Sequence, residues 1–246
     1  MRTSLVIAYL GGGLSGWQVQ AGRRTVQGEL QRALERVCGR SIQVTAAGRT
    51  DAGVHAIGQV AHCDVPAGIP ARGLHAALNG VLPADVRVLR ARRAAGTFHA
   101  RRDATAKRYR YRIAWGMTLE PWEALRTWEV PYRLDVPAMS RAASALVGTH
   151  DFTALALSGH SGTGRRGCSR TVHGAILRRH GRRVSIIVAG DGFLRGMVRR
   201  IAGALVEVGR GAQPPTWIAA LLVDPATRPT APTAPAFGLT LERVFY

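Results

Sequence analysis

The sequence predicts an α+β protein made of two pseudo-duplicated βαββαβ halves, in which antiparallel sheets flank a central basic cleft. Three observations lead to this prediction. Strand-like alternation and helix-like spacing of apolar residues follow one another in the same order in both halves, although the residues themselves do not repeat. The length of 246 residues and the hydrophobic content of 46% suit one large or two small globular domains. The formal charge of +19 requires a strongly basic surface.

The first half, residues 1–104, is expected to hold six elements. Thr25 and Gly39 mark the start and the end of its first helix, because threonine caps helix N-termini and glycine ends helices. In chain order, the expected elements are a strand over 2–9, a helix over 25–38, strands over 41–46 and 58–65, a helix over 70–79 and a strand over 86–92.

The second half, residues 105–246, is expected to repeat this order with one extra helix. Its clearest signal is a hairpin, since two alternating runs flank His180 and Gly181. The expected elements are a strand over 107–115, a helix over 135–147, strands over 171–179 and 183–189, helices over 193–208 and 214–223, and a strand over 238–246.

The charge indicates the class of partner. Lysine and arginine number 34 against 15 acidic residues, and Lys107 is the single lysine. A GC-rich gene explains arginine in place of lysine, but it does not explain the excess of cations. A strongly basic globular protein most often binds a polyanion, and nucleic acid is the default. A membrane surface is disfavoured, because the sequence has no basic amphipathic helix with an apolar face.

Other classes of protein are excluded by what the sequence lacks. No apolar run reaches the roughly 18 residues that span a bilayer. The three cysteines are widely spaced and form no Cys/His cluster, which argues against a metal site and favours a reducing, cytoplasmic compartment. Gly11-x-Gly13-x-x-Gly16 matches a dinucleotide fingerprint, but no helix opens directly from these glycines. We therefore expect no cofactor and no metal.

The segment Gly48–His55 concentrates the chemistry of the sequence. Asp51 lies two residues from Arg49 in a loop flanked by glycines. An arginine partner keeps a carboxylate ionised, and an ionised, positioned carboxylate serves as a nucleophile or a base. The alternative hypothesis is a turn aspartate that only makes local backbone hydrogen bonds.

Two further segments carry candidate binding residues. In the strand 107–115, Tyr109 and Tyr111 share one face, where they either pack in the core or stack on a base. In the helix 193–208, Arg199 and Arg200 either line a binding surface or are simply solvated.

Motifs spread along the chain resemble those of the TruA family of tRNA pseudouridine synthases. The resemblance covers nearly the full length, and collinear motifs over such a length are highly specific. The matching stretches are Gly16-Trp17-Gln18-x-Gln20, Thr25-Val26-Gln27, residues 48–56 with Gly58-Gln59-Val60, Ala77-Leu78-Asn79 with Leu82-Pro83, Phe98-His99-Ala100-Arg101, Arg108-Tyr109-Arg110-Tyr111, residues 148–153 and Met197-Val198-Arg199.

The resemblance implies an isomerase that converts uridine to pseudouridine in the anticodon arm of tRNA, at positions 38 to 40. It implies that Asp51 is the catalytic residue, that Tyr109 lies against the target base and that Arg199 pairs with the aspartate. We expect Arg49 to contact the substrate as well. The family also implies a homodimer that needs no cofactor.

Several positions depart from the family pattern, and they bear on tRNA positioning and site choice. They are Leu10, Leu155, Arg195, Gly196 and Arg200. Two rival hypotheses stay open. One is a non-catalytic RNA-binding or tRNA-folding protein on the same fold, and the other is a pseudouridine synthase with a shifted RNA target.

Overall fold

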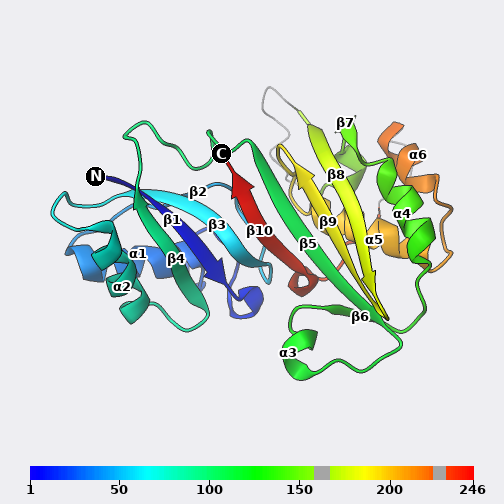
Figure 1. The fold of residues 1–246 in the computed structure, drawn as a ribbon, viewed down its shortest axis with the longest axis horizontal. Coiled ribbons are helices and arrows are strands. Elements are labelled where there is room, and N and C mark those ends of the chain that lie inside the picture. The colour runs from blue at the N-terminus through cyan, green and yellow to red at the C-terminus, as the bar shows by residue number, and fades with distance from the viewer. Residues whose placement is uncertain (158–166, 224–230) are drawn as a thin grey trace. The chain divides into compact units, whose positions relative to one another are not determined.

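The computed structural model describes residues 1–157, 167–223 and 231–246. The chain packs as two compact units. Unit 1 contains Met1–Thr105 and Leu241–Tyr246, and unit 2 contains Ala106–Thr240. The mixture of strands and helices confirms the predicted α+β class (Figure 1). The duplication of the two halves and their functional division stay predictions.

Unit 1 is built on strands in the order β4-β1-β3-β10, in which β1 is antiparallel to both β3 and β4. Its helices α1 and α2 contact each other, and both bury leucine side chains. The elements that begin in this unit are β1 (Arg2–Tyr9), α1 (Val26–Cys38), β2 (Thr45–Ala46), β3 (His55–Asp64), α2 (Ala71–Val81) and β4 (Val86–Arg93), joined by β10 (Leu239–Phe245), whose residues from Leu241 onward belong here.

Helix α1 begins and ends where the sequence predicts. The Thr25 hydroxyl accepts a hydrogen bond from the Gly28 backbone N–H, and Gly39 closes the helix in the left-handed region at φ 71°. The predicted strand over 41–46 is much shorter, because only Thr45 and Ala46 pair with β3. Most of that stretch is therefore loop, and it leads into the Asp51 segment.

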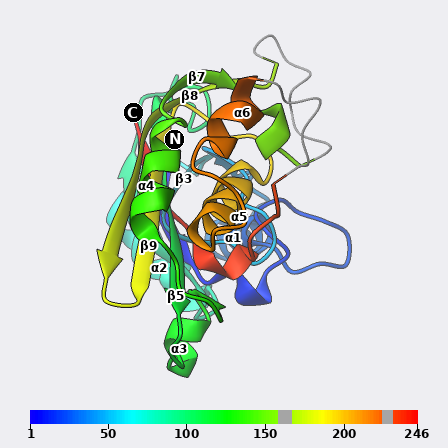
Figure 2. The same ribbon diagram turned by 90° about the vertical axis from the view of Figure 1, so that its right-hand side faces the viewer.

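Unit 2 is built on strands in the order β5-β9-β8-β7, with β6 parallel to β5. Helices α5 and α6 lie to one side of β8 and β9, as Figure 2 shows. The elements are β5 (Ala106–Trp115), α3 (Pro121–Ala124), β6 (Trp128–Val130), α4 (Val136–Ser144), β7 (Gly148–Asp151), β8 (Ser169–His180), β9 (Arg183–Gly190), α5 (Met197–Gly209) and α6 (Trp217–Val223).

Helix α5 begins at Met197 rather than at Phe193, so this part of the prediction is wrong. Gly196 precedes it with φ +67°, a conformation that ends regular helix on its N-terminal side. A Cβ placed on Gly196 would lie 2.5 Å from the Leu157 side chain. A larger residue does not fit there, so this glycine fixes where the helix starts.

None of the helices in the described residues is both long and apolar enough to cross a bilayer. The described ranges also hold no group of three or more His, Cys, Asp or Glu side chains that could bind a metal ion.

Candidate active site

Asp51 lies in the loop between β2 and β3, and backbone hydrogen bonds hold this loop against the segment 11–24. The Trp17 N–H donates to the Thr50 carbonyl at 3.0 Å, and the Gly53 N–H donates to the Leu14 carbonyl at 3.4 Å. Within the loop, the Val54 N–H donates to the Asp51 carbonyl at 3.2 Å. The backbone on both sides of Asp51 is therefore fixed.

The glycines of the segment 11–24 allow this close approach. Gly16 has φ +84°, and a Cβ on it would lie 2.8 Å from the Thr50 carbonyl oxygen. A Cβ on Gly11 would collide with the Val54 carbonyl oxygen. Two of the glycines in the apparent dinucleotide fingerprint thus serve backbone packing against the Asp51 loop.

A buried polar group supports the same loop from the sheet. The hydroxyls of Tyr9 and Thr50 form a hydrogen bond of 2.8 Å. The Gln59 Nε2 donates to the Gly48 carbonyl at 2.8 Å and to the Tyr9 hydroxyl at 3.5 Å. Burial raises the pKa of Tyr9 to about 12, so its hydroxyl stays protonated at neutral pH. Sequence reasoning missed this support, although a glutamine inside an apolar strand signals a buried polar contact.

His55 also has a structural role in this loop. The Gly11 N–H donates to His55 Nδ1 at 3.0 Å, and the imidazole is buried. Since Nδ1 accepts a hydrogen bond, it carries no proton in this arrangement. His55 thereby joins the end of the Asp51 loop to the turn after β1.

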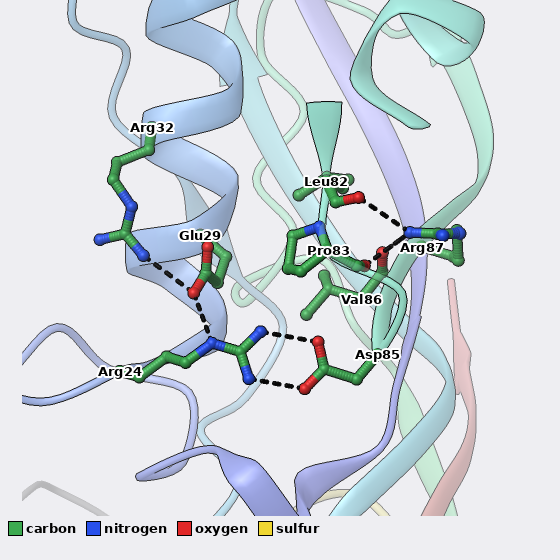
Figure 3. A network of polar contacts seen from close by, with 8 residues as sticks. All are labelled: Arg24, Glu29, Arg32, Leu82, Pro83, Asp85, Val86 and Arg87. Carbon is green, nitrogen blue, oxygen red and sulfur yellow. Dashed lines mark hydrogen bonds and ion pairs between the residues drawn. The ribbon is translucent and has the colours of Figure 1, made fainter. Parts of the chain in front are cut away.

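A salt-bridge network anchors the segment 11–24 in turn, as Figure 3 shows. The Arg24 guanidinium binds both carboxylate oxygens of Asp85 at 2.7 Å and Glu29 at 2.7 Å. Hydrogen bonding to Arg24 lowers the pKa of Asp85 below its ordinary value. The Arg24 carbonyl accepts from the Ser15 N–H at 2.8 Å. Leu10 is one of the positions that depart from the family pattern, and it lies beside this network. Its N–H donates to the Asp85 carbonyl at 2.9 Å.

Successive residues of the Asp51 loop differ in their exposure to solvent. Arg49 is exposed, Thr50 is buried and Asp51 is half-buried. Arg49 and Asp51 form no ion pair with each other in the part of the chain that the structure describes. Arg49 therefore does not act as the carboxylate's partner in unit 1, and its role toward the substrate stays a prediction.

In unit 2, Tyr109 and Tyr111 share one face of β5 as predicted, but their surroundings differ. Tyr111 is fully buried, and its hydroxyl donates to the Pro235 carbonyl at 2.8 Å. Tyr109 keeps 7% of its surface exposed, and its ring meets the Phe193 ring edge-on with centroids 5.2 Å apart. Tyr111 is thus a core residue, while Tyr109 lies at the margin of the core.

Arg199 and Arg200 occupy the first turn of α5, and neither is simply solvated. The Arg199 Nε donates to the Ala234 carbonyl at 2.8 Å, and the Arg199 carbonyl accepts from the Ala234 N–H at 3.2 Å. Arg200 contacts the Ala154 carbonyl at 3.3 Å, and burial lowers its pKa. Arg199 is therefore held in place by its own unit. The pairing of Arg199 with Asp51 stays a prediction.

The comparisons with known proteins agree on one family. A family model described as tRNA pseudouridine synthase matches residues 5–101 and 142–246. The tRNA pseudouridine synthase A of Myxococcus xanthus is 43% identical over 245 residues, which cover 100% of this chain and 92% of that protein. The proteins of the same name from Frankia casuarinae and Moorella thermoacetica are each 44% identical, over 100% and 98% of this chain and 89% and 98% of those proteins.

A solved structure, the crystal structure of a Cbf5-Nop10-Gar1 complex, is also similar. Its TM-score is 0.32 at 12% identity, over 82% of this chain and 54% of that chain. This likeness is too weak to support an inference about the present chain.

Proposed function

The chain belongs to the tRNA pseudouridine synthase family, and from this premise we propose that it isomerises uridine to pseudouridine at positions 38 to 40 of the tRNA anticodon stem-loop. The single observation that carries the proposal is Asp51. Its half-buried side chain lies on a loop whose backbone is fixed by the Tyr9–Thr50 hydrogen bond and by Trp17. A catalytic carboxylate needs such positioning to meet a reacting carbon.

The reaction rearranges bonds within one nucleotide. The bond between N1 of uracil and C1′ of ribose breaks, the base turns, and a bond forms between C5 and C1′. The C5 proton is released, and N1 gains one, so substrate and product are isomers. Asp51 would act by attacking the sugar, attacking the base or removing a sugar proton. All three roles require an ionised carboxylate.

The resemblance to the family also implies roles for two residues of unit 2. Tyr109 would cover one face of the extruded uracil, since it lies at the margin of the core and retains a small exposed surface. The resemblance implies that Arg199 pairs with Asp51, and a hydrogen bond to the Ala234 carbonyl holds Arg199 on the first turn of α5. Arg49, which is exposed, would contact the RNA.

The charge of the chain fits a tRNA substrate. With a formal charge of +19, the protein attracts the phosphate backbone, and phosphate contacts offset the few kcal/mol that removing a base from its stack costs. We also propose that the protein is a homodimer and that it binds the anticodon arm of the tRNA. Both proposals rest on the resemblance to the family.

The experiment that tests this proposal maps pseudouridine in an unmodified tRNA transcript after incubation with the purified protein. We expect new pseudouridine at positions 38 to 40 where uridine is present. Pseudouridine at other positions would favour the shifted-target hypothesis. A transcript that binds but stays unmodified would favour a non-catalytic RNA-binding protein.

A further inference from the structure

A short turn between β4 and β5 is tied to unit 1 at several points. We call residues 98–103 the pinned turn. Arg2 donates to the Phe98 carbonyl at 2.6 Å, and the Tyr246 hydroxyl donates to the Ala100 carbonyl at 2.7 Å. The buried His62 accepts from the Ala100 N–H through Nδ1 at 3.1 Å. A connecting loop on a protein surface usually has far fewer anchors.

Aromatic contacts reinforce these hydrogen bonds. The His62 ring lies 4.8 Å from the His99 ring and 6.2 Å from the Phe98 ring, centroid to centroid. The Phe98 ring lies 5.1 Å from the Tyr246 ring. The first half of the pinned turn is therefore held by side chains from β1, β3 and the end of the chain.

The second half of the pinned turn is organised by His99. Its Nδ1 accepts hydrogen bonds from the backbone N–H groups of Arg101 and Arg102, each at 3.2 Å. The Asp103 carboxylate accepts from the His99 N–H at 2.9 Å, and the Asp103 N–H returns a bond to the His99 carbonyl at 3.0 Å. The backbone of both arginines is thus fixed before any ligand arrives.

The side chains of Arg101 and Arg102 are exposed, in contrast to this fixed backbone. Neither forms an ion pair within the described residues. The acidic groups near them are engaged elsewhere. Asp64 binds Arg2 through both oxygens at 2.8 and 3.0 Å, and Asp103 accepts from the His99 backbone. The pinned turn therefore presents two neighbouring guanidinium groups to solvent.

We infer that the pinned turn is a preorganised phosphate-binding surface, on which Arg101 and Arg102 contact the sugar-phosphate backbone of the RNA substrate. The inference rests on the proposed function for its partner, since a tRNA supplies the polyanion. Arginine binds phosphate in a bidentate fashion, and a fixed backbone lowers the entropy lost when the side chains become ordered. Such contacts position the RNA and carry no sequence information.

The test compares two double variants that each remove two positive charges. R101Q/R102Q changes the pinned turn, and R90Q/R92Q changes two exposed arginines of the edge strand β4, which also form no ion pair in the described part of the chain. The readouts are tRNA binding as a function of salt, and KM and kcat for pseudouridine formation.

We expect R101Q/R102Q to raise KM about tenfold with kcat within twofold of the unchanged protein. The slope of log Kd against log salt should fall by about 1.4–1.8, since each lost phosphate contact removes about 0.7–0.9. R90Q/R92Q should change the slope by less than half as much. Equal changes in the two double variants, or an unchanged KM in R101Q/R102Q, would overturn the inference.

A second pair of variants tests the preorganisation while both arginines stay in place. His99→Ala removes the acceptor for the two backbone N–H groups, whereas the amide oxygen of His99→Asn is placed to replace Nδ1. We expect His99→Ala to raise KM and His99→Asn to restore it. A KM for His99→Ala equal to that of the unchanged protein would contradict the role of the pinned backbone. Because binding is measured without turnover, a protein that binds tRNA in this way but forms no pseudouridine would refute the proposed function alone.

Discussion

The loop that carries Asp51 is held in place by contacts of the neighbouring residues. The loop is held through the Thr50 hydroxyl, the Gly48 carbonyl and the Gly53 N–H, and none of these bonds involves the Asp51 carboxylate. A turn aspartate holds the backbone with its own side chain, so a turn role predicts that Asp51→Asn is mild. A catalytic role predicts that the same change abolishes pseudouridine formation.

Tyr109 gives a prediction that separates a stacking role from a core role. Tyr109→Phe keeps the ring and should retain most of the activity, whereas Tyr109→Ala should lose about 1–3 kcal/mol of contact with the base. The measurement is kcat/KM together with the melting temperature of the same preparation. A large fall in melting temperature for Tyr109→Ala, with kcat/KM lost in proportion, would show that the ring serves the core instead.

His62 gives a prediction about stability and pH. Burial, with a smaller effect of the Arg2 guanidinium, lowers the pKa of His62 from its ordinary value of 6.5. A group whose pKa is lowered in the folded state binds its proton more tightly in the unfolded state. Its contribution to the free energy of unfolding is therefore complete above the ordinary pKa and is lost as the pH falls below that value. We expect the free energy of unfolding to decline as the pH falls below about 6.5.

The control for His62 is His62→Asn, whose amide oxygen can accept the Ala100 N–H without titrating in this range. Denaturant unfolding of both proteins at several pH values gives the comparison. If the two proteins lose stability in parallel as the pH falls, the titrating group is not His62.

At the scale of elements, the segment 11–24 works as a support for the Asp51 loop, and Gly16 tests this. Gly16→Ala and Gly22→Ala both place a side chain at positive φ, +84° and +66°, which costs about 1–2 kcal/mol. A Cβ on Gly16 also meets the Thr50 carbonyl, whereas a Cβ on Gly22 meets nothing within 4 Å. Gly16→Ala should therefore reduce kcat at least tenfold and Gly22→Ala much less, in a pseudouridine assay at a temperature where both are folded. Equal activity of the two variants would show that the segment does not position Asp51.

The sequence predicts elements well where the signal is local. The Thr25 cap, the Gly39 stop and the apolar spacing between them define α1 without tertiary information. The short elements α3, β6 and β7 have three or four residues each and no periodicity that a sequence pattern can detect. The start of α5 is not visible in the apolar spacing, because it depends on the positive φ of Gly196, where Leu157 lies close by.

The candidate site likewise has parts that the local sequence predicts and parts that depend on residues far apart in the chain. The glycines and the arginine around Asp51 make it a candidate from its loop alone, while its catalytic role is implied by the resemblance to the family. The support from Tyr9 and Gln59 is not predictable from that loop, since these residues lie on β1 and β3, more than eight positions from Thr50 along the chain. Their contact arises from the pairing of β1 with β3.

At the scale of the whole molecule, the positive charge predicts strongly salt-dependent binding. With 34 basic and 15 acidic residues, tRNA binding should weaken steeply between low and physiological salt, because each neutralised phosphate releases counterions. A filter-binding titration at several salt concentrations measures the slope. Arg199→Ala should leave most of this binding intact while it impairs turnover. A log–log slope near zero would refute the interpretation that the charge serves a polyanion.

The proposed residues come from both units, since Asp51 belongs to unit 1 and Tyr109 and Arg199 belong to unit 2. Each unit holds its own residues rigidly, through the Thr50 anchor in unit 1 and the Ala234 contacts in unit 2. We propose that Asp51 carries the chemistry at the target uridine, and removing its charge without changing its shape tests this most directly.

That test is Asp51→Asn. Asparagine nearly matches the shape of aspartate but supplies no anionic nucleophile or base at neutral pH. Tritium release from C5-labelled uridine in tRNA should be abolished, while the melting temperature and the tRNA affinity stay close to those of the unchanged protein. Tritium release within about tenfold of the unchanged protein, a barrier difference of only about 1.4 kcal/mol, would contradict the assignment of Asp51.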